Sequence, residues 1–174
     1  MFLPRKLSAP KPWVWDKEID VLAIPERGAY PATEEGAAEF QAAQDKYDAA
    51  WAEFRKTGNV AAVPVKPGCV ATVFHLASLT IDQIRHIDGL PVGANITETI
   101  AYGCHNIENL SRPLAAMGDA MEIVKVVRVA SQCGYRLPDE ILELFQDDRL
   151  RLAVYLEIKR AGRVTKEAAK SDRG

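Results

Sequence analysis

The chain has 174 residues, of which 48% are hydrophobic and 26% are charged; this composition supports a folded core in one domain of ordinary size and excludes global disorder. Its formal net charge of −2 excludes the overall positive field with which proteins hold nucleic acid non-specifically, so nucleic acid is not expected as a partner. No run approaches the roughly 20 apolar residues that span a bilayer, and no membrane partner is expected either.

Residues 1–32 are predicted to form an extended N-terminal arm. They contain five of the ten prolines, each of which removes a backbone donor and disfavours helix at the preceding residue. The arm is nevertheless apolar, because it also contains Trp13, Trp15, Ile19 and Leu22. A segment rich in proline and aromatic residues is expected to adhere to its own domain or to a neighbouring subunit.

Residues 33–58 are predicted to form one amphipathic helix. Thr33 suits the N-cap position, two glutamates follow in the first turn, and Gly58 suits the end of the helix. Large apolar residues recur at helical spacing along it: Phe40, Tyr47, Trp51 and Phe54. This stripe predicts a helix that packs against another helix.

Residues 59–162 are predicted to form a compact domain that begins with a β-hairpin. Two prolines restrict Val60–Lys66 to an edge strand, since proline cannot donate to a strand ladder. Pro67 and Gly68 then stand in the order of a type II turn, and Val70–Leu76 is expected to return as the partner strand.

The rest of this domain is predicted to be helical, with helices over residues 80–88, 95–110, 114–133 and 138–160. Thr80 and Gln83 form a capping-box pattern at the start of the first helix, and Gly89 follows its last turn. The β-branched run Ile123–Val129 leaves a strand as the alternative for part of the third helix. Gly162 is expected to end the last helix.

Residues 163–174 complete the chain as a basic C-terminal tail, with one last short helical turn at Thr165–Lys170. Solubility is the simplest role for this tail, and binding of phosphate or of an acidic protein face is the alternative. The predicted fold class is therefore mainly α with a small β-hairpin (α+β), in which a helical domain is preceded by the extended proline-rich arm.

The sequence contains no motif for catalysis, cofactor binding or a metal site, so no cofactor, metal or catalytic residue is predicted. P-loop, GxGxxG, GxSxG and HExxH patterns are all missing. The three histidines and three cysteines lack the CxxC or HxxxH spacing that brings two ligands to one ion. A Cys–His pair that meets only in the fold is the catalytic alternative, but Cys104 lies on the predicted buried side of its helix, where thiols are usually inert.

Three segments resemble small tail-module proteins of long-tailed bacteriophages. Residues 67–87, PGCVATVFHLASLTIDQIRHI, resemble the strand-then-helix opening, roughly F-x-L-x-x-L-T, of tail assembly chaperones. Residues 100–110, IAYGCHNIENL, resemble the glycine-containing helix and asparagine-containing segment that often come next. Residues 157–171, EIKRAGRVTKEAAKS, resemble the lysine-rich ending of such proteins. The resemblance spans residues 67–110 and 157–171, about a third of the chain.

The resemblance implies a phage-encoded, mostly helical protein that binds other phage structural proteins, such as the tape-measure protein or tail proteins, without cofactor or catalytic residues. The leading hypothesis is a tail-module assembly chaperone that shields an aggregation-prone partner in the host cytoplasm during infection. The partner is predicted to contact eight apolar residues: Trp13, Trp15, Ile19, Leu22, Phe40, Tyr47, Trp51 and Phe54.

Other functions are kept as alternatives. The first is a permanent virion component whose arm clamps neighbouring subunits in a homo-oligomer. The second is an intracellular inhibitor of a host defence system, and an enzyme is the least supported. A chaperone is expected to be missing from finished particles, whereas a virion component is expected in them at a stoichiometric copy number.

Overall fold

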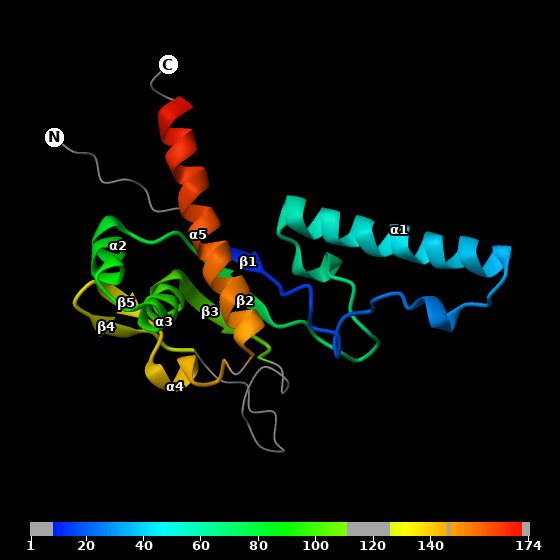
Figure 1. Ribbon diagram of the computed structural model, residues 1–174, viewed down its shortest axis with the longest axis horizontal. Coiled ribbons are helices and arrows are strands. Elements are labelled where there is room, and N and C mark those ends of the chain that lie inside the picture. The colour runs from blue at the N-terminus through cyan, green and yellow to red at the C-terminus, as the bar shows by residue number, and fades with distance from the viewer. Residues whose placement is uncertain (1–8, 111–125, 146, 172–174) are drawn as a thin grey trace. The chain divides into compact units, whose positions relative to one another are not determined.

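The computed structural model describes residues 9–110, 126–145 and 147–171, and for residues 164–171 it describes the backbone alone. The described residues fold into two compact units (Figure 1), one formed by Val14–Ala71 and the other by residues 9–13 together with the described residues from 72 onward. Helices dominate, and a small antiparallel sheet accompanies them, which confirms the predicted α+β class. None of the helices in the described ranges combines the length and apolar character that crossing a membrane requires.

The Val14–Ala71 unit is organised by the long helix α1 (Glu34–Thr57), whose bounds agree with the predicted ones. Thr33 caps its start, because its Oγ1 accepts a hydrogen bond of 3.1 Å from the backbone N–H of Gly36. Gly58 ends the helix at φ 70°, a left-handed conformation that glycine adopts at little cost. Two short 3₁₀ turns flank it, η1 (Arg27–Ala29) before and η2 (Val60–Ala62) after.

The segment before α1 pairs with the segment after η2. An isolated antiparallel bridge joins Leu22 to Val65, the N–H of Ala23 donates to the carbonyl of Pro64 (3.0 Å), and that of Lys66 donates to the carbonyl of Val21 (2.8 Å). The core of this unit consists of buried apolar side chains from the arm, α1 and the chain after it: Val14, Trp15, Val21, Leu22, Trp51, Phe54, Val63 and Ala71. Most of the arm beyond Trp13 is therefore folded into this unit.

The predicted hairpin between Val60–Lys66 and Val70–Leu76 is wrong. Its turn is present, since the N–H of Cys69 donates to the carbonyl of Lys66 (3.0 Å) and Gly68 has φ 75°. The strands on either side of this turn, however, pair with other parts of the chain. Turn residues fix only the local reversal, and here pairing with distant segments decides the sheet.

The sheet of the other unit has three antiparallel strands in the order β1 (Lys11–Trp13), β2 (Val73–Leu76) and β3 (Cys104–Glu108). Trp13 lies opposite Phe74, and their ring centroids are 5.7 Å apart. The middle strand β2 is almost entirely buried, which explains why its sequence is a continuous apolar run interrupted by one histidine.

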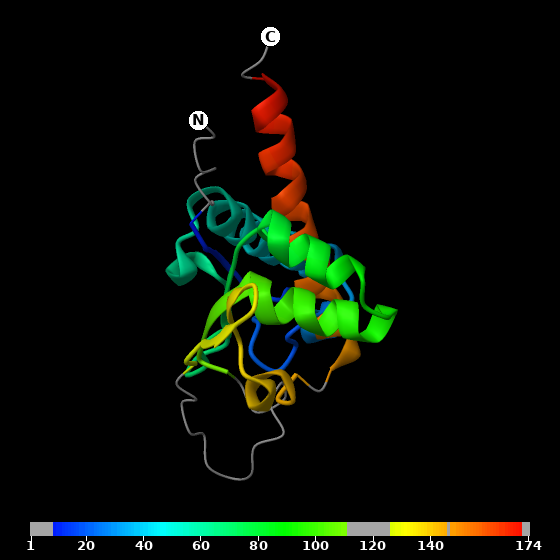
Figure 2. The ribbon, with the colours of Figure 1, turned by 90° about the vertical axis from the view of Figure 1, so that its left-hand side faces the viewer.

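Helix α2 (Ile81–Asp88) confirms the predicted capped helix. Thr80 and Gln83 form the complete capping box, with the N–H of Thr80 donating to Gln83 Oε1 at 2.9 Å and that of Gln83 donating to Thr80 Oγ1 at 3.2 Å. The next helix, α3 (Val92–Gly103), begins and ends earlier than the predicted 95–110, because residues from Cys104 onward pair with β2 as strand β3. Helix α3 contacts both α2 and α5 (Figure 2).

The prediction of a helix over 114–133 is wrong where the structure describes it; residues 111–125 lie outside the described residues. Strands β4 (Val129–Ser131) and β5 (Gly134–Arg136) form a hairpin there. The β-branched residues favour strand, and Gly134 has φ 108°, a conformation that L residues rarely adopt.

The predicted 138–160 helix is divided into α4 (Asp139–Leu142) and α5 (Asp148–Ser171). Asp147 explains the second start, because its Oδ1 accepts a hydrogen bond of 2.8 Å from the N–H of Arg149. Helix α5 continues through Gly162, so the predicted end there is wrong, and the predicted last turn at Thr165–Lys170 is part of α5. Its buried side chains, Leu150, Val154 and Ile158, lie at four-residue intervals on one face.

Candidate functional site

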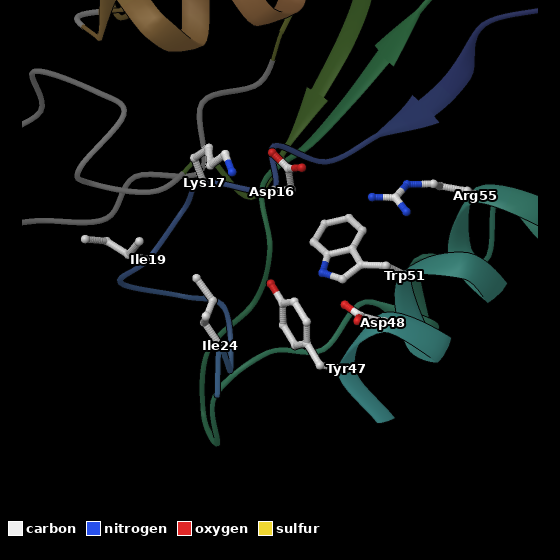
Figure 3. A pocket seen from close by; sticks show the side chains of 8 residues that line it. All are labelled: Asp16, Lys17, Ile19, Ile24, Tyr47, Asp48, Trp51 and Arg55. Atoms are coloured by element: carbon white, nitrogen blue, oxygen red, sulfur yellow. The ribbon is translucent and has the colours of Figure 1, made fainter. Parts of the chain in front are cut away.

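The Val14–Ala71 unit contains a pocket of about 340 Å³ (Figure 3). Its walls come from two parts of the chain that are far apart in sequence. One is the segment before η1, and the other is the second half of α1. The lining residues are Asp16, Lys17, Ile19, Ile24, Tyr47, Asp48, Trp51 and Arg55. A volume of this order is at the lower end of the range in which proteins bind small ligands or short peptide segments.

Helix α1 supplies one wall through residues at four-residue spacing. Tyr47, Trp51 and Arg55 share one face of the helix, because side chains four residues apart lie one above the other. The rings of Tyr47 and Trp51 meet edge to face with centroids 6.3 Å apart, and the guanidinium carbon of Arg55 lies 5.6 Å from the centroid of Trp51. Arg55 and Tyr47 thus hold the indole ring in a fixed orientation.

The segment at Asp16–Ile24 supplies the other wall and is tied to its own unit at several points. The backbone N–H groups of Val21 and Leu22 both donate to the carbonyl of Glu18, at 3.1 and 2.9 Å, which makes a tight turn. Lys66 Nζ donates to the carbonyl of Ile19 at 2.8 Å. Leu22 points into the core, whereas Ile19 and Ile24 are 65% and 36% exposed beside the pocket.

The indole nitrogen of Trp51 is the unusual atom of this site. Trp51 is only 4% exposed, and its Nε1 has no hydrogen-bond partner in the part of the chain that the structure describes. In Figure 3 the ring extends from α1 into the space between the lining side chains, with its nitrogen on the side turned away from the helix. Leaving a buried donor unsatisfied costs about 1–3 kcal/mol, and buried tryptophans usually avoid this cost by finding an acceptor.

The charges of the pocket are balanced. Asp16 and Asp48 contribute two negative charges, and Lys17 and Arg55 two positive charges. Figure 3 shows these four side chains around the aromatic pair rather than on one side of it. The charges therefore give the site no strong preference for an anion or a cation.

The structure brings together three of the eight residues predicted to contact a partner, namely Ile19, Tyr47 and Trp51. The others lie elsewhere. Trp15, Leu22 and Phe54 are buried in the core of their unit. Phe40 contacts Tyr30 with ring centroids 5.7 Å apart and lies under the guanidinium of Arg27, and Trp13 belongs to strand β1.

Sequence reasoning missed the remaining pocket residues. Arg55 continues the four-residue spacing of Tyr47 and Trp51, so the same helical periodicity that singled out the aromatic pair could have found it. Ile24 and the charged pair Asp16–Lys17 carry no such signal. These residues lie beside α1 because the arm pairs with residues 64–66. No local sequence pattern predicts that pairing.

The other unit holds Cys104, the cysteine considered for the catalytic alternative, and its neighbour in β3, His105. Cys104 is fully buried, and this burial raises the pKa of its thiol to about 12. Burial, and then the positive charge of Arg128, lowers the pKa of His105 to about 4. At neutral pH the Cys104 thiol and the His105 imidazole are therefore both uncharged.

Arg128 organises the surroundings of this pair. Its Nη1 lies 3.1 Å from His105 Nδ1 and its Nη2 lies 3.0 Å from the carbonyl oxygen of Tyr102. Since a guanidinium only donates hydrogen bonds, Nδ1 of His105 is the acceptor and the imidazole proton is on Nε2. Within the described ranges, no three His, Cys, Asp or Glu side chains converge in a way that would hold a metal ion.

Comparisons with protein-family models, with curated proteins and with solved structures gave no match to this chain. The pocket of the Val14–Ala71 unit is the structural observation on which a function can be argued.

Proposed function

We propose that this chain is a non-enzymatic protein that binds another protein through the pocket of its Val14–Ala71 unit, as an assembly protein of a phage tail. The observation that carries the proposal is the pocket in which Tyr47 and Arg55 lie beside the exposed Ile19 and Ile24. Exposed apolar side chains cost free energy in water, and a partner that covers them removes this cost.

The composition of the pocket supports a protein partner. Centres of protein interfaces are rich in tryptophan, tyrosine and arginine, surrounded by polar or charged residues at the rim. Trp51, Tyr47 and Arg55 reproduce this arrangement on α1, with Asp16, Lys17 and Asp48 beside them. Ile19 adds an exposed apolar side chain of the kind that a partner covers.

The assignment to a phage tail rests on the resemblance of the three segments. The first of these segments, residues 67–87 of this chain, is expected from the resemblance to form a strand followed by a helix, and here β2 is followed by the capped helix α2. That order supports the proposal without identifying the partner. The tape-measure protein and other tail proteins are the partners that the resemblance suggests.

A permanent virion component is the second candidate, and a separate surface favours it. Leu152 and Leu156 lie one turn apart on α5 and are 49% and 52% exposed. An apolar pair of this kind on a long helix suits contact between copies of the chain in a homo-oligomer. The two candidates share a protein-binding role and differ in whether the chain stays in the particle.

Photo-crosslinking in infected cells tests the proposal. A benzoylphenylalanine at position 19 is expected to crosslink the chain to a phage structural protein, whereas the same group at position 70 is not. Val70 is the matched control, because it belongs to the same unit and is 59% exposed but does not line the pocket. Equal crosslinking from both positions, or none from position 19, would contradict the proposal.

Particle composition separates the two candidates. An assembly protein is abundant in the lysate of infected cells and missing from purified particles. A virion component appears in particles at a fixed ratio to the tail proteins, as measured by quantitative mass spectrometry.

A further inference from the structure

We infer that copies of this chain associate head to tail, with an exposed stripe on α5 of one copy packed antiparallel against an exposed stripe on α1 of the next copy. The inference goes beyond the proposed function, because none of the residues in the two stripes lines the pocket. Three properties of the stripes support it: their exposure, their spacing and their charge.

Helix α5 has apolar side chains on two opposite sides. Leu150, Val154 and Ile158 are buried on one side, whereas Leu152 and Leu156 are 49% and 52% exposed. Since successive residues turn by about 100° around a helix, the two exposed leucines lie on the side away from the core. An exposed arginine follows at each end of the leucine pair, so the α5 stripe consists of Arg149, Leu152, Leu156 and Arg160.

Helix α1 has an exposed stripe of small apolar and acidic residues. It lies on the side of the helix away from the buried Trp51 and Phe54, and it consists of Glu34, Ala38, Ala42 and Asp45. Asp45 Oδ1 accepts a hydrogen bond of 2.8 Å from Gln41 Nε2, which orients the carboxylate on this surface. Alanines leave room for larger side chains of a facing helix to pack close to the backbone.

The two stripes have the same spacing when one of them is read backwards. From Arg149 to Arg160 the steps are three, four and four residues, and from Asp45 back to Glu34 they are again three, four and four. Antiparallel packing therefore brings each arginine to a carboxylate and each leucine to an alanine, over about 16 Å of helix. The expected pairs are Arg149–Asp45, Leu152–Ala42, Leu156–Ala38 and Arg160–Glu34.

The charges of the two helices are complementary. Helix α1 contains six acidic and three basic residues, whereas residues 148–163 of α5 contain two acidic and five basic ones. Arg149 pairs with Asp147 at 3.0 Å and Arg160 with Glu157 at 3.1 Å, but these arginine side chains are 82% and 73% exposed. Exposed ion pairs contribute little to stability, so the arginines can turn to a second carboxylate at small cost.

The same charges argue against a contact between two α5 helices. Antiparallel packing of two leucine pairs would bring Arg149 of one copy near Arg160 of the other, and like charges repel each other. The contact between α5 and α1 is instead heterologous, since it joins two different surfaces. Each copy then has one surface for each of two neighbours, and association continues until a ring closes or a filament grows.

Sedimentation velocity of the full chain over a series of concentrations tests the inference. The wild-type chain is expected to form species larger than a monomer as its concentration rises. Two variants reverse the charge of one stripe each: Glu34→Lys with Asp45→Lys on α1, and Arg149→Glu with Arg160→Glu on α5. Each variant alone is expected to associate about tenfold more weakly or less, because attraction at both ends of the contact becomes repulsion.

An equimolar mixture of the two variants is the decisive sample. The reversed α1 stripe of one variant is complementary to the reversed α5 stripe of the other, so the mixture is expected to associate as the wild type does. Matched controls change the net charge equally at exposed positions outside both stripes: Glu39→Lys with Asp82→Lys, and Lys11→Glu with Arg85→Glu. These controls are expected to associate as the wild type does.

Four outcomes would overturn the inference: a wild-type chain that stays monomeric, a reversed variant that associates like the wild type, a mixture that stays monomeric, or an equal loss of association in the controls. If only the α5 variant loses association, the leucine pair has another occupant and the inference is wrong. Crosslinking from position 19 tests the pocket separately, so either proposal can fail while the other stands.

Discussion

Gly103 faces the side chain of Ile158 at such close range that a Cβ atom at position 103 would lie 2.5 Å from Ile158 Cγ2. Ile158 is buried on the inner face of α5, and Gly103 is the last residue of α3 before the chain continues as β3. The absence of a side chain at Gly103 therefore sets how closely the two helices approach.

Replacing Gly103 by alanine is expected to destabilise the protein by about 1–3 kcal/mol, the usual cost of inserting a methyl group into a filled core. The buried, β-branched Ile158 has no free rotamer with which to avoid the new group. Chemical unfolding in urea measures the change. Gly93→Ala in the same helix is the control, because nothing lies within 4 Å of its added Cβ, and it is expected to be neutral or stabilising. Equal effects of the two variants would contradict this account of α3–α5 packing.

Gly36 is constrained by backbone rather than by a side chain. A Cβ atom there would overlap the carbonyl oxygen of Pro31, just before α1 begins. Gly36→Ala is expected to lower the free energy of unfolding by more than about 1 kcal/mol, since backbone atoms cannot move aside as a flexible side chain does. Gly28→Ala, with open space around its Cβ, is expected to leave stability nearly unchanged. A stable Gly36→Ala variant would mean that the approach of Pro31 to α1 is adjustable.

His105 predicts a loss of stability in mild acid. Its pKa is lowered from 6.5 to about 4 in the folded chain, by burial and then by the charge of Arg128. Between these two values the unfolded chain binds a proton at His105 that the folded chain does not bind. Stability should therefore fall as the pH decreases from about 6.5 to 4, and the contribution of His105 to this loss should be complete below 4.

His105→Gln isolates this contribution from that of the carboxylates. The glutamine oxygen can still accept a hydrogen bond from Arg128 but does not titrate. The free energy of unfolding, measured by urea titration at a series of pH values, is expected to decrease less steeply in the variant than in the wild type. Parallel curves for the two proteins would show that His105 titrates alike in the folded and unfolded chain.

The three thiols are expected to differ in reactivity. Cys104 is buried and its pKa is raised to about 12, whereas Cys69 and Cys133 are free and partly exposed. Iodoacetamide at pH 8 should modify Cys69 and Cys133 in the folded protein and reach Cys104 only in urea. Peptide mass spectrometry reads the sites directly, and modification of all three at similar rates without denaturant would contradict the buried position of Cys104.

The local signals of the sequence predict the two capped helices α1 and α2 well. Thr33 and Gly58 bound α1, and Thr80 with Gln83 begins α2, because caps act through hydrogen bonds to the nearest backbone groups. The start of α5 at Asp147 has the same kind of signal. The prediction misses this second start, because Pro138 already marks a helix start nine residues earlier.

The sheet could not be predicted in this way. Strand β2 lies between Lys11–Trp13 and Cys104–Glu108, partners about 60 and 30 residues away along the chain. The residues of β3 were assigned to the preceding helix, and only their pairing with β2 makes them a strand. Pairing between strands that are distant in sequence cannot be predicted from a short window of residues.

The candidate site, too, could be predicted from the sequence only in part. Tyr47 and Trp51 were found from their helical spacing, and Ile19 from the apolar character of the arm. Ile19 is exposed, whereas Trp51, Trp15 and Leu22 of the same prediction are buried within their unit. Composition identifies which side chains avoid water, but the fold decides which of them remain available to a partner.

We propose above that a phage protein binds in the pocket formed by α1 and the segment at Asp16–Ile24. The most direct measurement is isothermal titration calorimetry of the protein retrieved by crosslinking at position 19, against the full chain and its Ile19→Ser and Val70→Ser variants. The account predicts that Ile19→Ser raises the Kd about tenfold, a loss of about 1.4 kcal/mol, and that Val70→Ser leaves it unchanged. Equal Kd values for all three proteins would contradict it.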